Sequence, residues 1–440
     1  MMVYIKCLLR KIPFVKIVVE KISKIKSDIH IYYILKRIGI NQKKALKDLQ
    51  NKKCLKCVFL VTHYQTWKYD YVYKRMEENE RFDPIVLICP TINYGHKKMI
   101  QHLSEGYNYF NELGYNVLRA YDSFNNIYVD IEKDLHADLI FYTNPYKGLI
   151  DNRYFIDRYF NYLTVYVSYN YGNNNDYNTF HNLSMHNYVW RLYAETDEHK
   201  KYSELYAKNR GRNVVTTGYP GIEPLLDTSS KPDYHDWKNQ DSRIKRIIWA
   251  PHHTLEAVGN VSYSCFMRYC DFMLEMADKY SSKVQFVFKP HPLLKDKLDL
   301  LWGVEKANAY YEQWVRRSNC SFHDGVYTKL FTSSDAMIHD CGSFLVEYLH
   351  LNKPVMRTLN EIPLEQMFNP FALRCLEYYY MAYNEQDVEQ FIQNVINGVD
   401  PLKEQRTKFV NEVLMPKGSP SQNIIDDILD SIDNQILYRN

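Results

Sequence analysis

Short apolar runs alternate with longer segments of helical period from residue 57 onward. In the first half of the chain, runs of strand length occupy residues 57–61, 84–90, 137–145, 163–172, 188–196 and 213–221. Helix-like segments such as 70–78 and 96–113 separate them. Apolar strands that alternate with helices are typical of a parallel sheet covered by helices on both faces.

A polar stretch that contains proline, residues 227–243, is typical of a linker, and the same alternation starts again after it. Strand-like runs lie at 245–251, 284–292 and 336–338, and helical segments lie at 262–280, 307–316, 326–334 and 419–437. We therefore predict an α/β protein in which two Rossmann-like domains face each other across a cleft. The expected segments are 51–230 and 231–415 for the two domains and 416–440 for a C-terminal helix.

The first fifty residues differ from the rest, because apolar clusters alternate there with lysine and arginine and acidic residues are few. This pattern predicts a basic amphipathic helical segment over residues 1–50 that is interrupted near Pro13. Such a segment can lie on an anionic membrane surface, where each Lys or Arg contributes about 1 kcal/mol. The alternative is a helix packed on the protein. A signal peptide is not expected, because the apolar stretch is interrupted by Lys6, Arg10, Lys11 and Lys16.

Composition narrows the class of protein. A chain of 440 residues with 46% hydrophobic residues can form large cores, and its net charge of +3 does not favour nucleic acid as a partner. The nine cysteines are scattered, and Cys54 and Cys57 form the only C-x-x-C pair. Because a zinc site needs four ligands and no second pair is present, this cysteine usage indicates the reducing cytosol.

Polar residues gather directly after the strand-like runs of the second half, and ligands of such sheets bind at the carboxyl ends of the strands. Imidazoles, an ammonium group and a Gly-Ser turn at one place suit a diphosphate, because a helix start offers free N–H groups and Gly allows close approach. Glu347 falls one helical turn after Ser343, where a carboxylate can hold a ribose hydroxyl. The predicted donor and phosphate-binding residues are His253, Thr254, Lys289, Asp340, Gly342, Ser343 and Glu347.

His291 is the strongest single candidate for catalysis. In Lys-Pro-His-Pro, two prolines fix the backbone around this histidine and aim its side chain, which core packing does not require. Other residues have plainer alternatives: Ser343 as a helix N-cap, Asp340 as a support of the turn, and His252 or His253 as buried histidines. We predict no metal and no cofactor, because carboxylates do not gather here and the two neighbouring histidines diverge in an extended backbone.

Four segments between roughly residues 215 and 360 resemble the CDP-glycerol glycerophosphotransferase family, the teichoic-acid-type polymerases and primases of the GT-B fold. They are, in chain order, TTGYPGIEPLL, IIWAPHHT, FVFKPHP and SSDAMIHDCGSFLVEYLHLNKPV. The resemblance implies a GT-B-like fold and metal-independent transfer of a polyol phosphate from a CDP-activated donor to a hydroxyl. It also implies that His291 binds the pyrophosphate or protonates the leaving CMP, and that Ser343 holds a phosphate.

Two departures from the family pattern stand out. Gly342 stands where the family has the first serine of a Ser-Ser pair. The Trp-His-Gly motif of the first half, whose histidine is the proposed base, has no clear counterpart, and its nearest equivalent is the segment 169–172. There Tyr171 precedes the glycine, and tyrosine is a poor base near neutral pH.

The acceptor side must therefore be assigned from strand ends rather than from a motif. Among the candidate bases His63, His181 and His186, His63 has the best position because it ends the first strand, and it is predicted to be catalytic together with His291. The side chains expected to line the acceptor groove are Trp67, Lys68, Tyr146 and Tyr171.

Three functions are open at this point. The first is a transferase that adds glycerol phosphate or a similar polyol phosphate to a cell-surface glycan or a lipid-linked acceptor. The second is a GT-B glycosyltransferase that uses a nucleotide sugar for surface polysaccharide synthesis. The third is a non-catalytic, membrane-associated binding protein, which the intact KPHP and Gly-Ser motifs disfavour. The first is favoured, and with it a cytoplasmic location on the inner face of the cell membrane.

Overall fold

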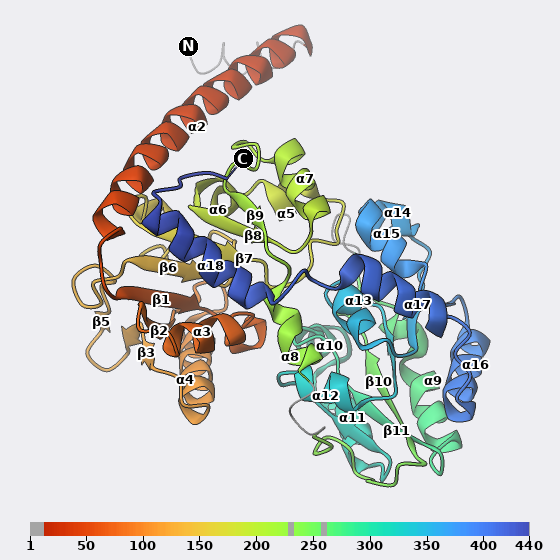
Figure 1. The fold of residues 1–440 in the computed structure, drawn as a ribbon. Helices are drawn as coiled ribbons and strands as arrows, with labels where there is room; N and C mark the ends of the chain where they lie inside the picture. Colours follow the sequence, from red (N-terminus) through yellow and green to blue (C-terminus); the bar gives the residue numbers. More distant parts are fainter. Residues whose placement is uncertain (1–12, 228–232, 257–261, 440) are drawn as a thin grey trace.

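The computed structural model describes residues 13–227, 233–256 and 262–439, with side chains from residue 28 onward in these ranges. Its described strands form two large parallel sheets, one in each half of the molecule, and one two-stranded ribbon (Figure 1). The first sheet ends at Thr216 and the second begins at Lys245. The architecture is α/β, with two sheet-and-helix halves connected by the segment between these residues.

The N-terminal half contains a seven-stranded sheet in the order β3-β2-β1-β6-β7-β8-β9, and all neighbouring strands are parallel. These strands are mostly apolar, as expected for a sheet that helices cover on both faces, although β8 begins with the buried Arg191. They span Val117–Arg119, Phe82–Ile88, Leu55–Val61, Leu139–Tyr142, Leu163–Val167, Arg191–Ala194 and Val214–Thr216, and the antiparallel ribbon β4-β5 spans Tyr121–Asp122 and Ile127–Tyr128.

The C-terminal half contains a six-stranded parallel sheet in the order β12-β11-β10-β13-β14-β15. In the same order, its strands span Cys320–Phe322, Val284–Phe288, Lys245–Ala250, Ala336–His339, Val355–Thr358 and Tyr380–Ala382. β10 thus lies between β11 and β13, so the segments that follow these three strands are neighbours at one edge of the sheet.

Helices connect the strands in both halves. Those of the N-terminal half are α3 Asp70–Glu77, α4 His96–Glu112, α5 Tyr177–His181, α6 Ser184–Tyr188, α7 Asp197–Tyr206 and α8 Glu223–Leu226, with short turns η1 Tyr64–Thr66, η2 Ile156–Arg158 and η3 Pro220–Ile222. Those of the C-terminal half are α9 Phe266–Lys279, α10 Leu294–Trp302, α11 Val304–Arg316, α12 Thr328–Ser333, α13 Phe344–Glu347, η4 Tyr348–Leu351, α14 Leu364–Met367, α15 Pro370–Leu376, α16 Glu385–Asn397, α17 Lys403–Phe409 and the π-helical η5 Val410–Leu414.

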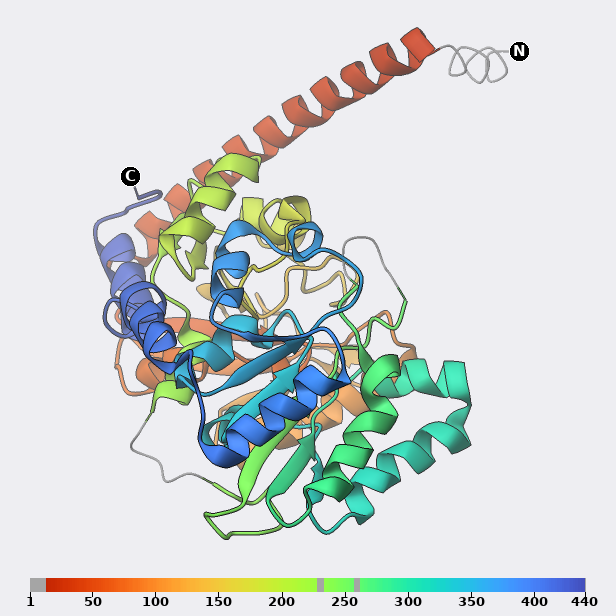
Figure 2. The same ribbon diagram turned by 90° about the vertical axis from the view of Figure 1, so that its right-hand side faces the viewer.

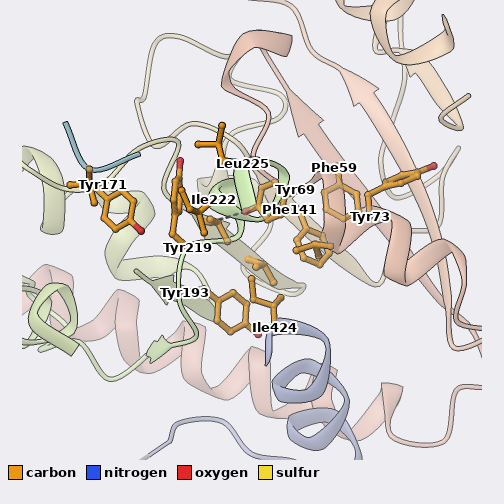
Figure 3. Close-up of a cluster of buried hydrophobic side chains, with 14 of the residues drawn as sticks. Phe59, Tyr69, Tyr73, Phe141, Tyr171, Tyr193, Tyr219, Ile222, Leu225 and Ile424 are labelled. Atoms are coloured by element: carbon orange, nitrogen blue, oxygen red, sulfur yellow. Dashed lines mark hydrogen bonds between the residues drawn. The ribbon is translucent and has the colours of Figure 1, made fainter. Parts of the chain in front are cut away.

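The core of the N-terminal half is rich in aromatic rings (Figure 3). Phe59 of β1 stacks on Phe141 of β6 with ring centroids 4.3 Å apart. The buried Tyr69 hydroxyl accepts from the Val167 N–H at 2.7 Å and donates to the Tyr142 carbonyl at 2.9 Å. A tyrosine in this core is therefore satisfied by backbone groups at the ends of two strands.

The last helix, α18 (Pro420–Asp433), returns from the C-terminal half and lies against the N-terminal half (Figure 1). Asp427 of α18 accepts from Arg191 Nε at 2.9 Å and from the Tyr193 hydroxyl at 2.9 Å, both on β8. Ile424 of the same helix joins the core cluster of the N-terminal half (Figure 3). The C-terminal helix expected from the sequence thus completes the half that contains the first sheet.

α2 (Pro13–Leu49) is a single helix of 37 residues that projects away from the N-terminal half (Figure 2). The expected interruption near Pro13 falls at the helix start, and residues 1–12 lie outside the described part. The predicted amphipathic character is wrong for the part of the helix whose side chains are described, 28–49, because five successive apolar residues at 31–35 face different sides of the helix. Contact with the protein comes from its C-terminal end, where Ile38, Leu46 and Leu49 are buried. No helix in the described ranges is long and apolar enough to cross a bilayer.

Candidate active site

The cleft at the carboxyl ends of the two sheets has two parts, of about 440 and about 650 Å³. The first, here called the charged compartment, is lined by side chains that include Lys68, Lys98, Glu105, Lys289, Asp296 and Asp324. The second, the amide compartment, is lined by side chains that include Asn170, Asn173, Asn174, Tyr146, Tyr263 and His253. Both are lined by Tyr169, His291 and Ser343, so these three residues mark the junction of the compartments.

Three histidines meet at this junction. His252 and His253 follow β10, His291 follows β11, and the three ring centroids lie 4.2–4.9 Å apart. The expectation that the two neighbouring histidines diverge is wrong, because the chain bends at His253 and the two ring centroids lie 4.4 Å apart. The His291 N–H donates to the Pro251 carbonyl at 3.0 Å, which holds the two strand ends together.

Hydrogen bonds fix the tautomers of two of these rings. His291 Nδ1 accepts from the Leu293 N–H at 3.1 Å. His252 Nδ1 accepts from the Thr254 N–H at 3.4 Å and from the Thr254 hydroxyl at 3.0 Å, since that hydroxyl itself accepts from the N–H groups of Tyr263 and Ser264. Both rings therefore carry their proton on Nε2 when neutral. Burial, together with the neighbouring His253 and Lys289, lowers the pKa of His291 to about 3, so this ring is neutral near pH 7.

The histidine cluster presents N–H donors rather than metal ligands. The candidate ligand atoms of His252, His253 and His291 lie within 4.8 Å of one another, which is close enough to consider a metal ion. A metal needs an unprotonated ring nitrogen, however, and the nitrogen left open on His252 and on His291 carries hydrogen. The geometry therefore fits an oxyanion, such as a phosphate, better than a cation.

Two predicted phosphate-binding residues lie behind the cleft and hold its backbone instead. Asp340 is buried, and its two carboxylate oxygens accept from the N–H groups of His252 at 2.5 Å and Cys265 at 2.6 Å. Burial raises the pKa of Asp340 to about 6, and these N–H groups oppose the rise. The Thr254 hydroxyl likewise bonds to groups of the protein, namely the N–H groups of Tyr263 and Ser264 and the His252 ring. Asp340 and Thr254 therefore hold the loop that carries His252 and His253 in place. For Asp340 this is the structural role, support of the turn, that the sequence offered as the alternative to ligand binding.

The Gly-Ser turn lies at the junction, as the sequence indicates. Ser343 precedes α13, lines both compartments, and its side chain makes no cap hydrogen bond to that helix. A Cβ at Gly342 would lie 3.3 Å from the Tyr263 ring, so glycine allows this ring to close on the turn. The Gly342 carbonyl accepts from Asn173 Nδ2 at 3.0 Å, which joins the turn to the N-terminal half. The serine hydroxyl remains available for a ligand.

Lys289 follows β11 and lines the charged compartment. Its ammonium group is nearly buried, donates to the Gly325 carbonyl at 3.1 Å, and lies 5.6 Å from the centre of the Tyr327 ring. Burial lowers its pKa to about 8. No carboxylate pairs with it among the described side chains. An anionic ligand would supply the missing charge.

Lys68 and Glu347 form an ion pair across the cleft, which differs from both predicted roles. Lys68 Nζ lies 3.1 Å from Glu347 Oε1, and the Tyr219 hydroxyl donates to the same oxygen at 3.3 Å. The Tyr327 hydroxyl bonds to Oε2 of Glu347 and to the Lys68 ammonium. The carboxylate expected to hold a ribose is thus fully engaged in this structure, and the lysine expected in the acceptor groove joins the two halves.

Of the residues predicted for the acceptor side in the N-terminal half, some line the cleft and others lie in the core. His63 lines the charged compartment beside His102, with ring centroids 4.7 Å apart, and burial lowers its pKa to about 4. Trp67 is not in the cleft compartments, because it packs edge-on against Phe59 and Phe110 in the core. His102 was missed by sequence reasoning, since it lies in the middle of α4 without any motif.

Tyr146 and Tyr171 both line the amide compartment. The Tyr146 hydroxyl lies 3.2 Å from the Tyr169 hydroxyl at the junction. Tyr171 is buried, and its hydroxyl lies 3.1 Å from His350 Nε2. The remaining candidate bases, His181 and His186, are buried outside both compartments.

Comparison with known proteins agrees with this geometry. Residues 168–363 match the family described as CDP-Glycerol:Poly(glycerophosphate) glycerophosphotransferase. The matched region contains the histidine cluster, Lys289, the Gly-Ser turn and the loop of the amide compartment. No curated protein matches the chain significantly. The predicted resemblance and the assignment as a transferase are thereby confirmed, and the match supports glycerophosphate transfer from a CDP-glycerol donor.

Solved structures show the same fold at low sequence identity. The wall teichoic acid polymerase TagF superimposes with a TM-score of 0.57 at 14% identity, covering 95% of this chain and 99% of that chain. The UDP-GlcNAc 2-epimerase from Neisseria meningitidis bound to UDP-GlcNAc gives a TM-score of 0.52 at 16% identity, covering 86% and 99%. The S. aureus MnaA–UDP structure gives 0.51 at 15%, covering 88% and 99%. The predicted GT-B-like fold is confirmed.

Proposed function

We propose that the cleft transfers a polyol phosphate, such as glycerol phosphate, from a CDP-activated donor to a hydroxyl of a glycan or lipid-linked acceptor. The observation that carries this proposal is the convergence of two Nε2–H imidazoles, a free serine hydroxyl and a buried ammonium group where β10, β11 and β13 end. These groups are His252, His291, Ser343 and Lys289. All four donate hydrogen bonds or positive charge, which is what a diphosphate requires.

The transfer can be written with named groups. The acceptor oxygen attacks the donor phosphorus that carries the polyol, the bond from this phosphorus to the CMP oxygen breaks, and a phosphodiester and CMP result. His291 Nε2–H donates a hydrogen bond to the departing phosphate and stabilises the charge that develops there. We assign the proton of the acceptor hydroxyl to His63, whose low pKa keeps its ring unprotonated near pH 7. The diphosphate raises that pKa when it binds nearby, which strengthens the base.

The direct test is product analysis. We expect incubation with a panel of CDP-polyols and nucleotide sugars to release CMP from a CDP-polyol and to join the polyol phosphate to an added hydroxyl compound. Release of UDP, GDP or CDP from a nucleotide sugar, with formation of a glycosidic bond, would replace the proposal by the glycosyltransferase alternative. No release from any donor would contradict both.

Lys289 gives a pH prediction. Its pKa of about 8 means that the free protein loses this positive charge as pH rises above 8. We therefore expect kcat/KM for the CDP-donor to fall about tenfold per pH unit above that point, since this ratio reports groups of the free enzyme. Lys289→Arg keeps its charge to higher pH and should remove the fall. A wild-type profile that stays flat to pH 9.5 would show that the donor does not depend on this charge.

We also place the protein on an anionic membrane surface, where a lipid-linked acceptor would be found. α2 exposes Ile29, Tyr32 and Tyr33 on its projecting part. A hollow of about 1150 Å³ between α2 and α7 is lined by the basic residues Lys36, Lys43, Lys208, Arg210 and Arg212 but only by Asp28 and Glu204 among acids. Apolar and basic groups together favour anionic lipid.

Deletion of residues 1–37 tests this location, because it removes Ile29, Tyr32, Tyr33 and Lys36 and ends before Ile38, where α2 begins to be buried. We expect the shortened protein to lose most of its sedimentation with vesicles that contain anionic lipid, while its CMP release in solution is unchanged. The wild-type protein should be released from the same vesicles at high salt. Equal sedimentation of both proteins would contradict the membrane assignment.

A further inference from the structure

Three buried polar atoms of the amide compartment have no hydrogen-bond partner among the described residues. They are Oδ1 of Asn170, Oδ1 of Asn173 and Nδ1 of His253. Asn173 is 4% exposed and donates through Nδ2 to the Gly342 carbonyl, which leaves its Oδ1 as the open acceptor. Buried polar atoms in folded proteins almost always have partners. The two amide oxygens can only accept, so they require a group that donates hydrogen bonds, whereas His253 Nδ1 can donate or accept according to its tautomer.

The open amide oxygens of Asn170 and Asn173 do not suit a phosphate, which would bind instead at the His252, His291 and Ser343 side of the same compartment. An amide oxygen only accepts hydrogen bonds, and a phosphate oxyanion also only accepts them, whereas a hydroxyl donates. Neither Lys nor Arg is among the residues that line this compartment in the described ranges. Its one carboxylate, Asp176, is already bonded to the Thr179 N–H at 3.2 Å and hydroxyl at 2.6 Å. An uncharged ligand with several hydroxyls meets these requirements.

Aromatic rings provide the remaining surface. Tyr146, Tyr169 and Tyr263 line the same compartment, and flat aromatic faces suit the C–H groups of sugars and polyols. The compartment opens at Ser343 and His291 to the place where the diphosphate is proposed to bind. A ligand here would therefore lie next to the reacting phosphorus.

We propose that the amide compartment, through Oδ1 of Asn170 and Asn173, binds an uncharged polyhydroxylated unit beside the reacting phosphate. The identity of that phosphate rests on the proposed function. The unit has two possible sources with the same chemistry: the polyol that the donor carries, and the terminal unit of the acceptor.

Asn170→Leu tests this assignment, because it keeps the side-chain size and removes the acceptor oxygen. Asn178→Leu makes the same change at an exposed position of α5 outside the compartment and serves as the control. Both variants should show the wild-type melting temperature. We expect Asn170→Leu, and not Asn178→Leu, to raise one KM at least tenfold. If the unit belongs to the acceptor, the acceptor KM rises and acceptor-free hydrolysis of CDP-glycerol is unchanged.

If the unit belongs to the donor, the KM for CDP-glycerol rises and the inhibition constant of CMP is unchanged. Values within twofold of wild type for both substrates would overturn the assignment. Saturation-transfer NMR with free glycerol and ribitol needs no turnover and separates this inference from the proposed function. Signals in the wild type that Asn170→Leu loses would support the compartment even if no CDP-polyol reacts. Equal signals in the wild type and the variant, or none in the wild type, would contradict it.

Discussion

His291→Ala is expected to lower kcat for CMP release from a CDP-polyol about 10²–10⁴-fold, the range typical for removal of a group that assists a leaving group. The reason is geometric, since the Leu293 N–H orients the ring and leaves Nε2–H as its only open group. The ring is neutral before the donor binds, so its first contribution is a hydrogen bond. His291→Gln, which can place an amide N–H near the same position, should recover about tenfold of the loss. Steady-state release of CMP measures both.

His235→Ala is the matched control for this experiment. This histidine is 86% exposed and lies outside both compartments, so its removal should leave the kinetics unchanged. Wild-type activity of His291→Ala would remove the histidine from the mechanism. Activity of the Gln variant no higher than that of Ala would mean that the ring transfers a proton rather than donating a hydrogen bond.

Lys68→Ala is expected to give the largest loss of stability, about 3–5 kcal/mol, because it leaves the Glu347 carboxylate buried without its cation. The side chains of Lys68 and Glu347 are 9% and 1% exposed. Replacement of both partners by apolar residues, Lys68→Met with Glu347→Leu, should cost much less, because no charge is then left alone. Urea unfolding followed by tryptophan fluorescence gives the comparison.

Arg316→Ala removes an exposed pair with Glu312 in α11 and should change stability little. If Lys68→Ala were equally mild, the pair would not be buried in solution, and Glu347 would be free for the ribose contact that the sequence suggested. Because Lys68 and Glu347 belong to opposite halves, the same experiment reports how tightly the halves are held together.

The sequence predicts the strand ends well and the partners across the cleft poorly. His291 and Ser343 could be found because apolar strands are visible in one sequence and ligands bind where such strands end. The edge strands β3, β12 and β15 were not found, because they have three residues each, too few for a periodic signal; β9 is as short but lies in the longer run 213–221. Asp340 and Glu347 were assigned to ligands because nothing in a sequence shows which N–H or ammonium group will face a carboxylate.

The residues of the amide compartment could not be assigned from the sequence for the same reason. Asn170 and Asn173 lie in a loop where the family motif is absent, and asparagine-rich segments are common in loops without any binding function. Only the structure shows that two of these amide oxygens are buried and without a partner. His102 is similar, since one histidine in the middle of a helix has no distinguishing neighbour in sequence.

The return of α18 to the first sheet has a consequence for synthesis on the ribosome. The N-terminal half is translated first, yet the buried Arg191 on β8 finds its carboxylate only in Asp427, which is 236 residues later. Until that segment leaves the exit tunnel, the nascent first half must keep this guanidinium hydrated or bound by a chaperone. We therefore expect the N-terminal half to reach its final packing only after α18 has been synthesised. A chain that ends near residue 415 should accordingly have a destabilised N-terminal sheet, although its sequence is complete.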